Sequence, residues 1–152
     1  MTKIYATNKK IREYNVIESL EAGISLLGPE VKAIRNGNIV INEGFVRIKD
    51  GEAFLVNVNI SPVSPTSFFE KFNPLRVRKL LLRKNQIKRL VGKIKEKGVT
   101  IIPSKVYTKG RWIKVEIALV RHKTVHDKRQ KIIQREAQRR IKELLKHSRK
   151  VR

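Results

Sequence analysis

The stretch FVRIKDGEAFLVNV, residues 45–58, decides the fold class. Both of its halves are rich in apolar and β-branched residues, which is typical of strands. The dipeptide Asp50-Gly51 between them readily takes the positive φ angles that a two-residue hairpin turn requires. The sequence therefore predicts a β-hairpin over these residues, the unit from which antiparallel sheets are built.

A second, longer hairpin is predicted in the last third of the chain. Residues that favour strands run from Val99 to Ile102, from Lys105 to Tyr107 and again from Trp112 to Val120, with Lys109-Gly110 before the last run. The last run alternates, with Ile113, Val115, Ile117 and Leu119 on one face and Trp112, Lys114, Glu116 and Ala118 on the other. We expect the first face to lie in the core and the second to face water.

Two helices are predicted between the strands. In residues 85–98 the apolar residues recur at helical spacing, with Asn85 as the expected N-cap and Gly98 at the end. A shorter helix is predicted in residues 28–37, where Glu30 in the first turn complements the positive end of the helix dipole.

Strands nevertheless dominate the predicted elements, which also include residues 16–27. Residues 59–73, with two prolines and three serines, are typical of a long surface loop. This organisation favours a mainly β fold, an OB-like antiparallel β-barrel with flanking short α-helices, and this type includes nucleic-acid-binding domains.

Charge is the strongest functional signal. The chain carries 36 Lys and Arg residues against 13 Asp and Glu, a formal net charge of +23 in 152 residues. Self-repulsion of this size opposes compaction, and it favours a partner that supplies anions, such as a phosphate backbone. Residues 121–152 alone hold 13 Lys and Arg against three acidic residues. We therefore divide the chain into an OB-like RNA-binding barrel, residues 1–125, and a basic C-terminal tail, residues 126–152.

The tail has a helical pattern that its own charge opposes. Its apolar residues at helical spacing are Ile132, Ile133, Ala137, Ile141, Leu144 and Leu145. Like-charge pairs such as Arg135 with Arg139 destabilise a helix, and helices without tertiary packing are marginal in water. We expect the tail to be disordered alone and helical when bound to an anionic surface. The alternative is a C-terminal helix docked stably on the barrel.

The sequence offers few candidate residues for enzymatic catalysis. It has no cysteine, its eight glycines form no phosphate-binding loop, and its acidic residues mostly stand singly beside Lys or Arg. His122, His126 and His147 lie in or next to the basic tail, where neighbouring cations repel a metal ion. We expect no catalytic residues, no metal and no cofactor. No apolar run approaches the length of a membrane span. The absence of cysteine fits a reducing compartment, and we expect a cytoplasmic protein. We also expect it to be monomeric when free.

Two places combine aromatic rings with cations, as the recognition of unstacked RNA bases requires. The first is the outward strand face with Trp112 and Lys114. The alternative is that Trp112 packs under a helix or a loop. The second place consists of Phe68, Phe69 and Phe72, followed by Arg76, Arg78, Lys79, Arg83 and Lys84. We interpret these phenylalanines as a small core under the loop, with solvated charges around it.

Several short strings together add a family resemblance. In chain order they are Asn8-Lys9-Lys10 with Tyr14, Glu21-Ala22-Gly23-Ile24, residues 28–35, Asp50-Gly51-Glu52-Ala53, residues 74–82, Gly92-Lys93 to Lys97-Gly98, and His126-Asp127-Lys128-Arg129. These strings resemble the small protein B (SsrA-binding protein) family, the protein partners of transfer-messenger RNA in bacterial trans-translation. The departures from the family pattern are Pro29, Phe72 and residues 122–124.

The resemblance implies an OB-like barrel, a tail that becomes helical in the ribosome, and specific RNA contacts. Glu30, Leu81 and Lys114 match positions linked to binding the tRNA-like domain of transfer-messenger RNA. The full set of expected RNA-binding residues is Glu30, Lys32, Arg35, Arg76, Arg78, Lys79, Leu81, Trp112 and Lys114. The expected ribosome-contacting tail residues are His126, Asp127, Lys128, Arg129, Arg135, Arg139 and Arg140.

Each of these implied roles has a plain alternative. Glu30 can complement the helix dipole alone, Leu81 can be a core residue, and Lys114 can be a solvated cation. The expected function is non-enzymatic: the barrel binds the tRNA-like domain and delivers transfer-messenger RNA to stalled ribosomes, with the tail in the decoding region and the mRNA channel. The alternative is a structural ribosomal RNA-binding protein.

Overall fold

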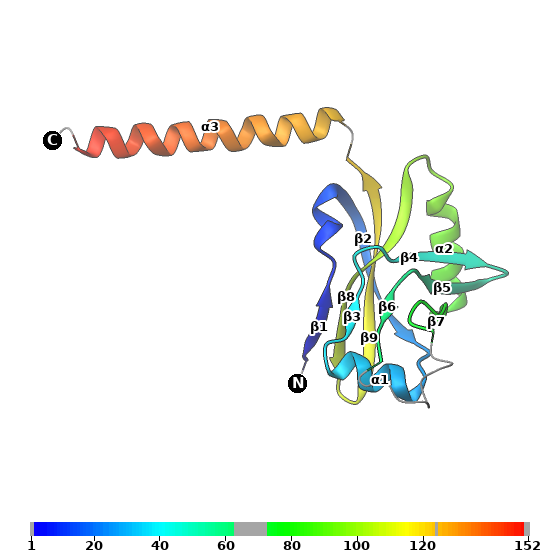
Figure 1. Cartoon of the computed structure of the whole chain (residues 1–152). Coiled ribbons are helices and arrows are strands. Elements are labelled where there is room, and N and C mark those ends of the chain that lie inside the picture. Colours follow the sequence, from blue (N-terminus) through cyan, green and yellow to red (C-terminus); the bar gives the residue numbers. More distant parts are fainter. Residues whose placement is uncertain (1, 63–72, 124, 151–152) are drawn as a thin grey trace. The chain divides into compact units, whose positions relative to one another are not determined.

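The computed structural model of the chain describes residues 2–62, 73–123 and 125–150 (Figure 1). By its internal contacts the chain separates into two units, Met1–His122 and Lys123–Arg152. We call the first unit the body and the second the tail unit, and each is described by itself. The predicted phenylalanine cluster at Phe68, Phe69 and Phe72, and most of the predicted loop, lie outside the described residues.

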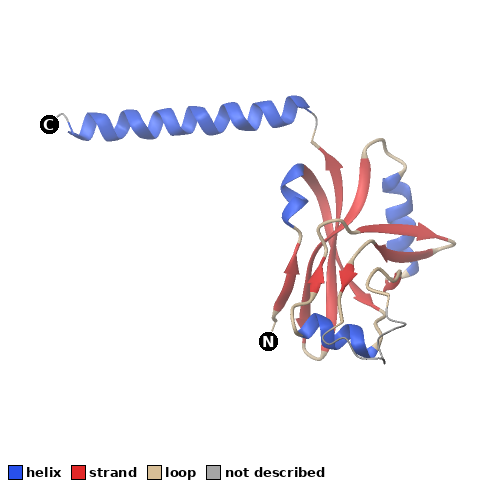
Figure 2. Cartoon of the chain, viewed as in Figure 1, coloured by secondary structure: helices blue, strands red, loops and turns tan. Residues whose placement is uncertain are grey.

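The body is built mainly from strands, with short helices between them (Figure 2). Its elements in chain order are β1 (Ile4–Thr7), the 3-10 helix η1 (Lys9–Glu13), β2 (Tyr14–Ile24), α1 (Gly28–Arg35), β3 (Ile39–Val40), β4 (Phe45–Lys49), β5 (Glu52–Val56), β6 (Asn59–Ile60), β7 (Arg78–Leu81), α2 (Lys84–Ile94), β8 (Val99–Lys109) and β9 (Trp112–His122).

Seven of these strands form one antiparallel sheet in the order β1-β8-β9-β2-β7-β5-β4, and β3 pairs with β6 in a second, two-stranded sheet. The large sheet curls, because its last strand, β4, contacts β8 near the other edge. Within the described residues no strand pairing joins β4 to β1, so the hydrogen bonds leave the barrel open. The predicted mainly β, OB-like architecture is confirmed in this open form.

Both predicted hairpins are present. Asp50 and Gly51 have φ angles of 52° and 74° between β4 and β5, as the two-residue turn requires. Gly110, at φ 61°, turns the chain between β8 and β9. The strand β8 is longer than predicted, since it continues through Pro103 with an irregularity in register between Pro103 and Lys105.

The core follows the predicted alternation on β9, with one correction. Ile113, Val115, Ile117 and Leu119 are all buried in the main core. Ala118, expected to face water, is fully buried too. It belongs to a second cluster with Ile102 and Val120, against which Ile11 and Tyr14 pack. The reason is that η1 and the start of β2 cover this end of the outer face, so only part of the face meets solvent.

The two predicted helices form with small changes at their ends. The first, α1, begins at Gly28 and carries Glu30 in its first turn. The second, α2, begins at Lys84, so Asn85 lies inside it and the prediction that Asn85 caps the helix is wrong. The side chain of Gln86 accepts a hydrogen bond from the Arg83 backbone N–H at 2.9 Å, and this bond caps the helix instead.

The tail unit contains one helix, α3 (Val125–Lys150). The helical spacing of its apolar residues predicted this element. Those apolar side chains are nevertheless exposed: Ile132, Ile133, Ile141, Leu144 and Leu145 are each more than half accessible. A helix whose apolar residues are exposed to water gains little stability from burial. Disorder of the tail in the free protein stays a prediction.

Candidate nucleic-acid interface

Strand pairing places four residues in one row on the outer face of the sheet. Tyr107 pairs with Lys114, Lys114 with Gly23, and Gly23 with Leu81, from β8 through β9 and β2 to β7. Paired residues in an antiparallel sheet share a face, so these four positions face the same side. Leu81 is 57% exposed, so the alternative that it is a core residue is wrong.

Gly23 lies in the middle of this row and has no side chain, so the surface is depressed there. A Cβ atom at this position would lie 3.1 Å from the Leu81 Cβ, which is closer than an ordinary contact. The glycine therefore leaves room for Leu81 and exposes backbone between Leu81 and Lys114.

Trp112 lies two residues before Lys114 on the same face and is 71% exposed. The alternative that it packs under a helix or a loop is therefore wrong for the described structure. A large indole held in water by a strand is costly for a monomer to expose, and it offers a flat surface on which a base can stack.

An acidic group on this face orders its neighbours. The Glu21 carboxylate accepts hydrogen bonds from the Tyr107 hydroxyl at 2.5 Å and from Lys109 Nζ at 3.4 Å. The hydrogen bond from Tyr107 holds the pKa of Glu21 below its usual value. Burial, together with this hydrogen bond, raises the pKa of Tyr107. These contacts hold the Tyr107 ring in place. Lys114, by contrast, makes no ion pair within the described residues.

Glu30 is the centre of a buried ion cluster. Its carboxylate accepts hydrogen bonds from Arg76 Nη2 at 2.6 Å, from Arg78 Nε at 2.6 Å and from the Leu27 backbone N–H at 2.8 Å. Burial alone would raise the pKa of Glu30, but the hydrogen bonds from Arg76, Leu27 and Arg78 outweigh it and lower that pKa.

Arg78 is also buried and ties three segments together. Besides Glu30, its guanidinium donates to the Val58 carbonyl at 2.8 Å and to the Pro74 carbonyl at 3.1 Å. Glu30 is 1% exposed and Arg78 is 0% exposed. Both were expected to contact RNA; in this structure both are buried, and their contact with RNA stays a prediction. The buried polar atoms of Glu30 and Arg78 are all paired within the protein, which is why these two charged side chains can be buried.

The other expected RNA-binding residues are accessible. Lys32 and Arg35 are exposed on α1, and Lys79 is exposed on β7, where it pairs with Glu52 at 3.1 Å. Arg76 is about one-third exposed, because part of its guanidinium is engaged by Glu30 and by the Ser25 carbonyl.

In the tail unit, His126, Asp127, Lys128 and Arg129 lie in the first turns of α3. Arg135, Arg139 and Arg140 are exposed farther along it.

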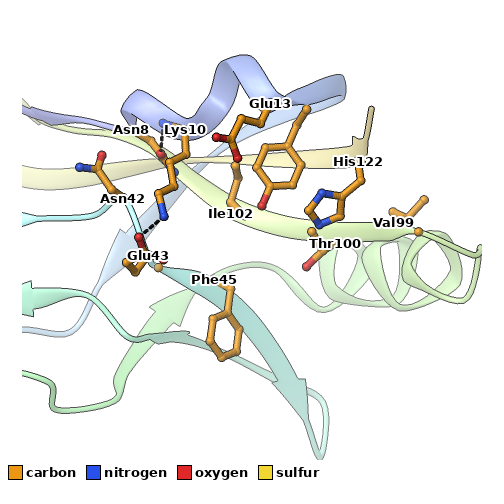
Figure 3. A pocket seen from close by; sticks show the side chains of 13 residues that line it. Asn8, Lys10, Glu13, Asn42, Glu43, Phe45, Val99, Thr100, Ile102 and His122 are labelled. Atoms are coloured by element: carbon orange, nitrogen blue, oxygen red, sulfur yellow. Dashed lines mark hydrogen bonds and ion pairs between the residues drawn. The ribbon is translucent and has the colours of Figure 1, made fainter. Parts of the chain in front are cut away.

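The body also has a hollow of about 460 Å³ at the junction of η1, β4 and β8, lined among others by Asn8, Lys10, Tyr14, Glu43 and His122 (Figure 3). Lys10 forms an ion pair with Glu43 across it. The rings of Tyr14 and His122 lie 4.5 Å apart, so His122 packs on an aromatic ring rather than standing in solvent alone.

Sequence reasoning missed Tyr107, Glu21 and Gly23 as members of the outer face. The alternation in β9 identified Trp112 and Lys114, but the residues opposite them depend on which strands pair and in what register. Among the described residues, no group of three or more His, Cys, Asp or Glu side chains could hold a metal ion. No described helix is long and apolar enough to cross a membrane.

Comparisons with known proteins agree over nearly the whole chain. The family model described as "SmpB protein" matches residues 5–147. The chain is 48% identical over 148 residues to the SsrA-binding protein of Pseudothermotoga lettingae, covering 95% of this chain and 98% of that protein. It is 46% identical over 149 residues to the SsrA-binding protein of Enterococcus faecalis, covering 97% and 96%.

A solved structure is similar as well. One chain from the work named "tmRNA-SmpB: a journey to the center of the bacterial ribosome" superposes with a TM-score of 0.66 at 40% identity, covering 78% of this chain and 84% of that one. The family resemblance inferred from the short strings is thereby confirmed, and this chain belongs to the SmpB family.

Proposed function

We propose that this protein binds the tRNA-like domain of transfer-messenger RNA and acts with it on stalled ribosomes in trans-translation. The observation that carries the proposal is the exposed outer face of the body, on which Trp112 and Leu81 stand in water beside Lys114. Its relatives named as SsrA-binding proteins, and the similar structure of tmRNA-SmpB, support the choice of this RNA.

Affinity and selectivity come from different groups in this proposal. The exposed cations Lys32 and Arg35 and the partly buried Lys114 neutralise phosphates, which strengthens binding to any RNA. Trp112 and Leu81 meet only unstacked bases or riboses, which a folded elbow displays and a regular duplex does not. The protein contributes binding and positioning, and no catalytic step is assigned to it.

The tail unit has a separate role in the ribosome. Its helix carries exposed arginines at Arg135, Arg139 and Arg140, which suit a channel lined by ribosomal RNA. We assign the His126–Arg129 segment and these arginines to contacts in the decoding region and the mRNA channel.

A competition experiment tests the proposal. Labelled tRNA-like elbow RNA bound to the protein is challenged with unlabelled elbow RNA or with a plain RNA duplex of equal charge. We expect the elbow RNA to compete much better. If about six phosphates are contacted, the logarithm of affinity falls with the logarithm of salt concentration at a slope of about −4 to −5. Equal competition by both RNAs contradicts the proposal.

A structural ribosomal protein would behave differently. It would remain with purified ribosomal subunits through a high-salt wash, and it would not prefer the free elbow RNA. A high-salt wash of ribosomal subunits that carry the bound protein therefore distinguishes the two functions.

A further inference from the structure

The solvent face of α2 has a gap in its side chains. Ile87 and Leu90 of this helix are buried against the body, and Gly92 lies on the opposite face. In a helix, positions three and four residues away are neighbours, so Lys88 and Arg89 on one side and Lys95 and Glu96, just past the end of α2, on the other surround the glycine. Three of these four neighbours are cations, and the residue between them has no side chain.

Nothing within the described residues explains this glycine. A Cβ atom placed on Gly92 meets no atom within 4 Å, and the residue is not among those with positive φ. A glycine inside a helix lowers stability relative to alanine, because it leaves more backbone freedom in the unfolded chain. A residue that weakens the helix without a packing or conformational reason suits the close approach of another backbone.

The charges around Gly92 favour a polyanion. The two nearby carboxylates are already engaged: Glu18 pairs with Arg89 at 2.9 Å and Glu96 pairs with Arg121 at 2.9 Å. The three lysines of this face form no ion pair within the described residues, and they are Lys84, Lys88 and Lys95. Lysines that are not paired with carboxylates attract phosphate groups.

The helix is also continuous with the outer face of the sheet. It follows β7 directly, and its residues Lys84 and Ile87 line a common hollow with Gly51 and Glu52 of the β4–β5 hairpin. A hollow of about 270 Å³ is lined by Leu81 and Lys79 of β7 and by Lys84 and Ile87 of α2. An RNA that contacts Leu81 can therefore extend over this hollow onto α2, past the ion pair of Lys79 with Glu52.

We propose that the solvent face of α2 is a second contact surface for the same tRNA-like RNA, and that its sugar–phosphate backbone passes directly over Gly92. This inference rests on the proposed function, because it extends the RNA surface that begins at Leu81. The lysines neutralise successive phosphates, and the missing side chain lets the backbone approach the helix closely.

The first test changes the glycine itself. Gly92→Ala should raise the midpoint of thermal unfolding by about 3 °C, because alanine favours the helix. Gly92→Gln, with a longer uncharged side chain, should weaken binding of the elbow RNA about tenfold, or about 1.4 kcal/mol. The matched control is Gly28→Ala, where a Cβ atom also meets nothing within 4 Å. Unchanged RNA affinity of Gly92→Gln overturns the inference.

The second test removes charge. The triple variant Lys84→Gln, Lys88→Gln, Lys95→Gln should reduce the steepness of the salt dependence by about 2 to 3, since each lost phosphate contact contributes about 0.7 to 0.9. The control variant replaces three exposed cations on other elements, Lys3, Lys9 and Arg47, and should reduce it by less than about 1. Equal reduction by both variants overturns the inference.

The outcomes also separate this inference from the proposed function. If the wild-type protein does not prefer elbow RNA over a duplex, the proposed function fails. If it does prefer the elbow and the α2 variants bind it like the wild type, only the present inference fails. Variants that bind the elbow normally but lose binding to small ribosomal subunits assign α2 to ribosomal RNA, which also overturns it.

Discussion

Glu30 is buried in this protein, where its carboxylate pairs with Arg76 and Arg78. Its carboxylate lies between two arginines of a single segment, of which one is buried and the other partly exposed. The carboxylate thereby fixes the direction of Arg76 and the start of β7, the strand that carries Leu81. A change at this buried residue can therefore affect the RNA surface through the position of its neighbours.

Replacing Glu30 should destabilise the fold strongly. Glu30→Gln leaves the buried Arg78 cation without its counter-charge, which costs about 3–5 kcal/mol. The measurement is the free energy of unfolding in urea. Glu52→Gln is the control, because Glu52 pairs with Lys79 at half-exposed positions, where such pairs contribute about 0–1 kcal/mol. Similar losses for the two variants would contradict this account of the cluster.

Acid should destabilise the protein partly through the same carboxylate. The pKa of Glu30 is lower in the folded protein than its ordinary value of 4.5. Its stabilising contribution is therefore fully present above that value and is lost as the pH falls through the lower pKa of the folded state. Thermal unfolding measured between neutral and acid pH should show a shallower loss for Glu30→Gln than for the wild type. Parallel curves would show that Glu30 does not contribute.

Trp112 should matter for RNA and little for stability. Since its side chain is 71% exposed, Trp112→Ala should change the free energy of unfolding by less than about 0.5 kcal/mol. Loss of base stacking should weaken binding of elbow RNA by about 1–3 kcal/mol, while Trp112→Phe keeps most of it. Binding titrations of the two variants decide this. An unaffected Trp112→Ala protein would remove the indole from the interface.

At the scale of elements, the long tail helix differs from α1 and α2. Those two helices bury residues such as Ile34 and Leu90 in the main core. The helix α3 leaves its apolar side chains exposed and carries like charges one turn apart, as at Arg135 and Arg139. Its stability therefore depends on what neutralises the charges.

A tail peptide of residues 123–152 should show this dependence. In low-salt buffer its circular dichroism should indicate little helix, because helices without tertiary packing are marginal. Addition of a polyanion such as RNA should raise the helical signal. Strong helicity before any addition would instead indicate a helix that forms without a partner.

At the scale of the whole molecule, the two units differ in what they contain. The body, Met1–His122, contains the main core and the outer face, while the tail unit is a single basic helix. Since each unit is defined by its own internal contacts, each should keep its properties when the other is altered.

Truncation before His126 tests this division. The shortened protein should unfold at the same temperature and bind elbow RNA with nearly unchanged affinity, because the core and the outer face remain. Ribosome rescue in a reconstituted translation system should be lost. Full-length protein with charge-neutral replacements at Arg135, Arg139 and Arg140 is the companion variant. Equal loss of RNA affinity and rescue would make the tail part of the RNA clamp.

The amino-acid sequence by itself determined the elements of this protein and its charge. Local rules suffice for a turn such as Asp50-Gly51, for the alternation along β9 and for the helical spacing in α3, because each depends on residues near in the chain. The family resemblance rested on the same local strings.

Only the tertiary structure decided which residues meet. The burial of Glu30 and Arg78, the exposure of Leu81 and the row that joins Tyr107 to Lys114 all follow from strand pairing across long stretches of chain. No local pattern encodes that pairing. The sequence around a charged residue is the same whether a distant segment of the chain buries that residue or leaves it in water. Register and burial are properties of the assembled sheet, because they arise from contacts between distant segments.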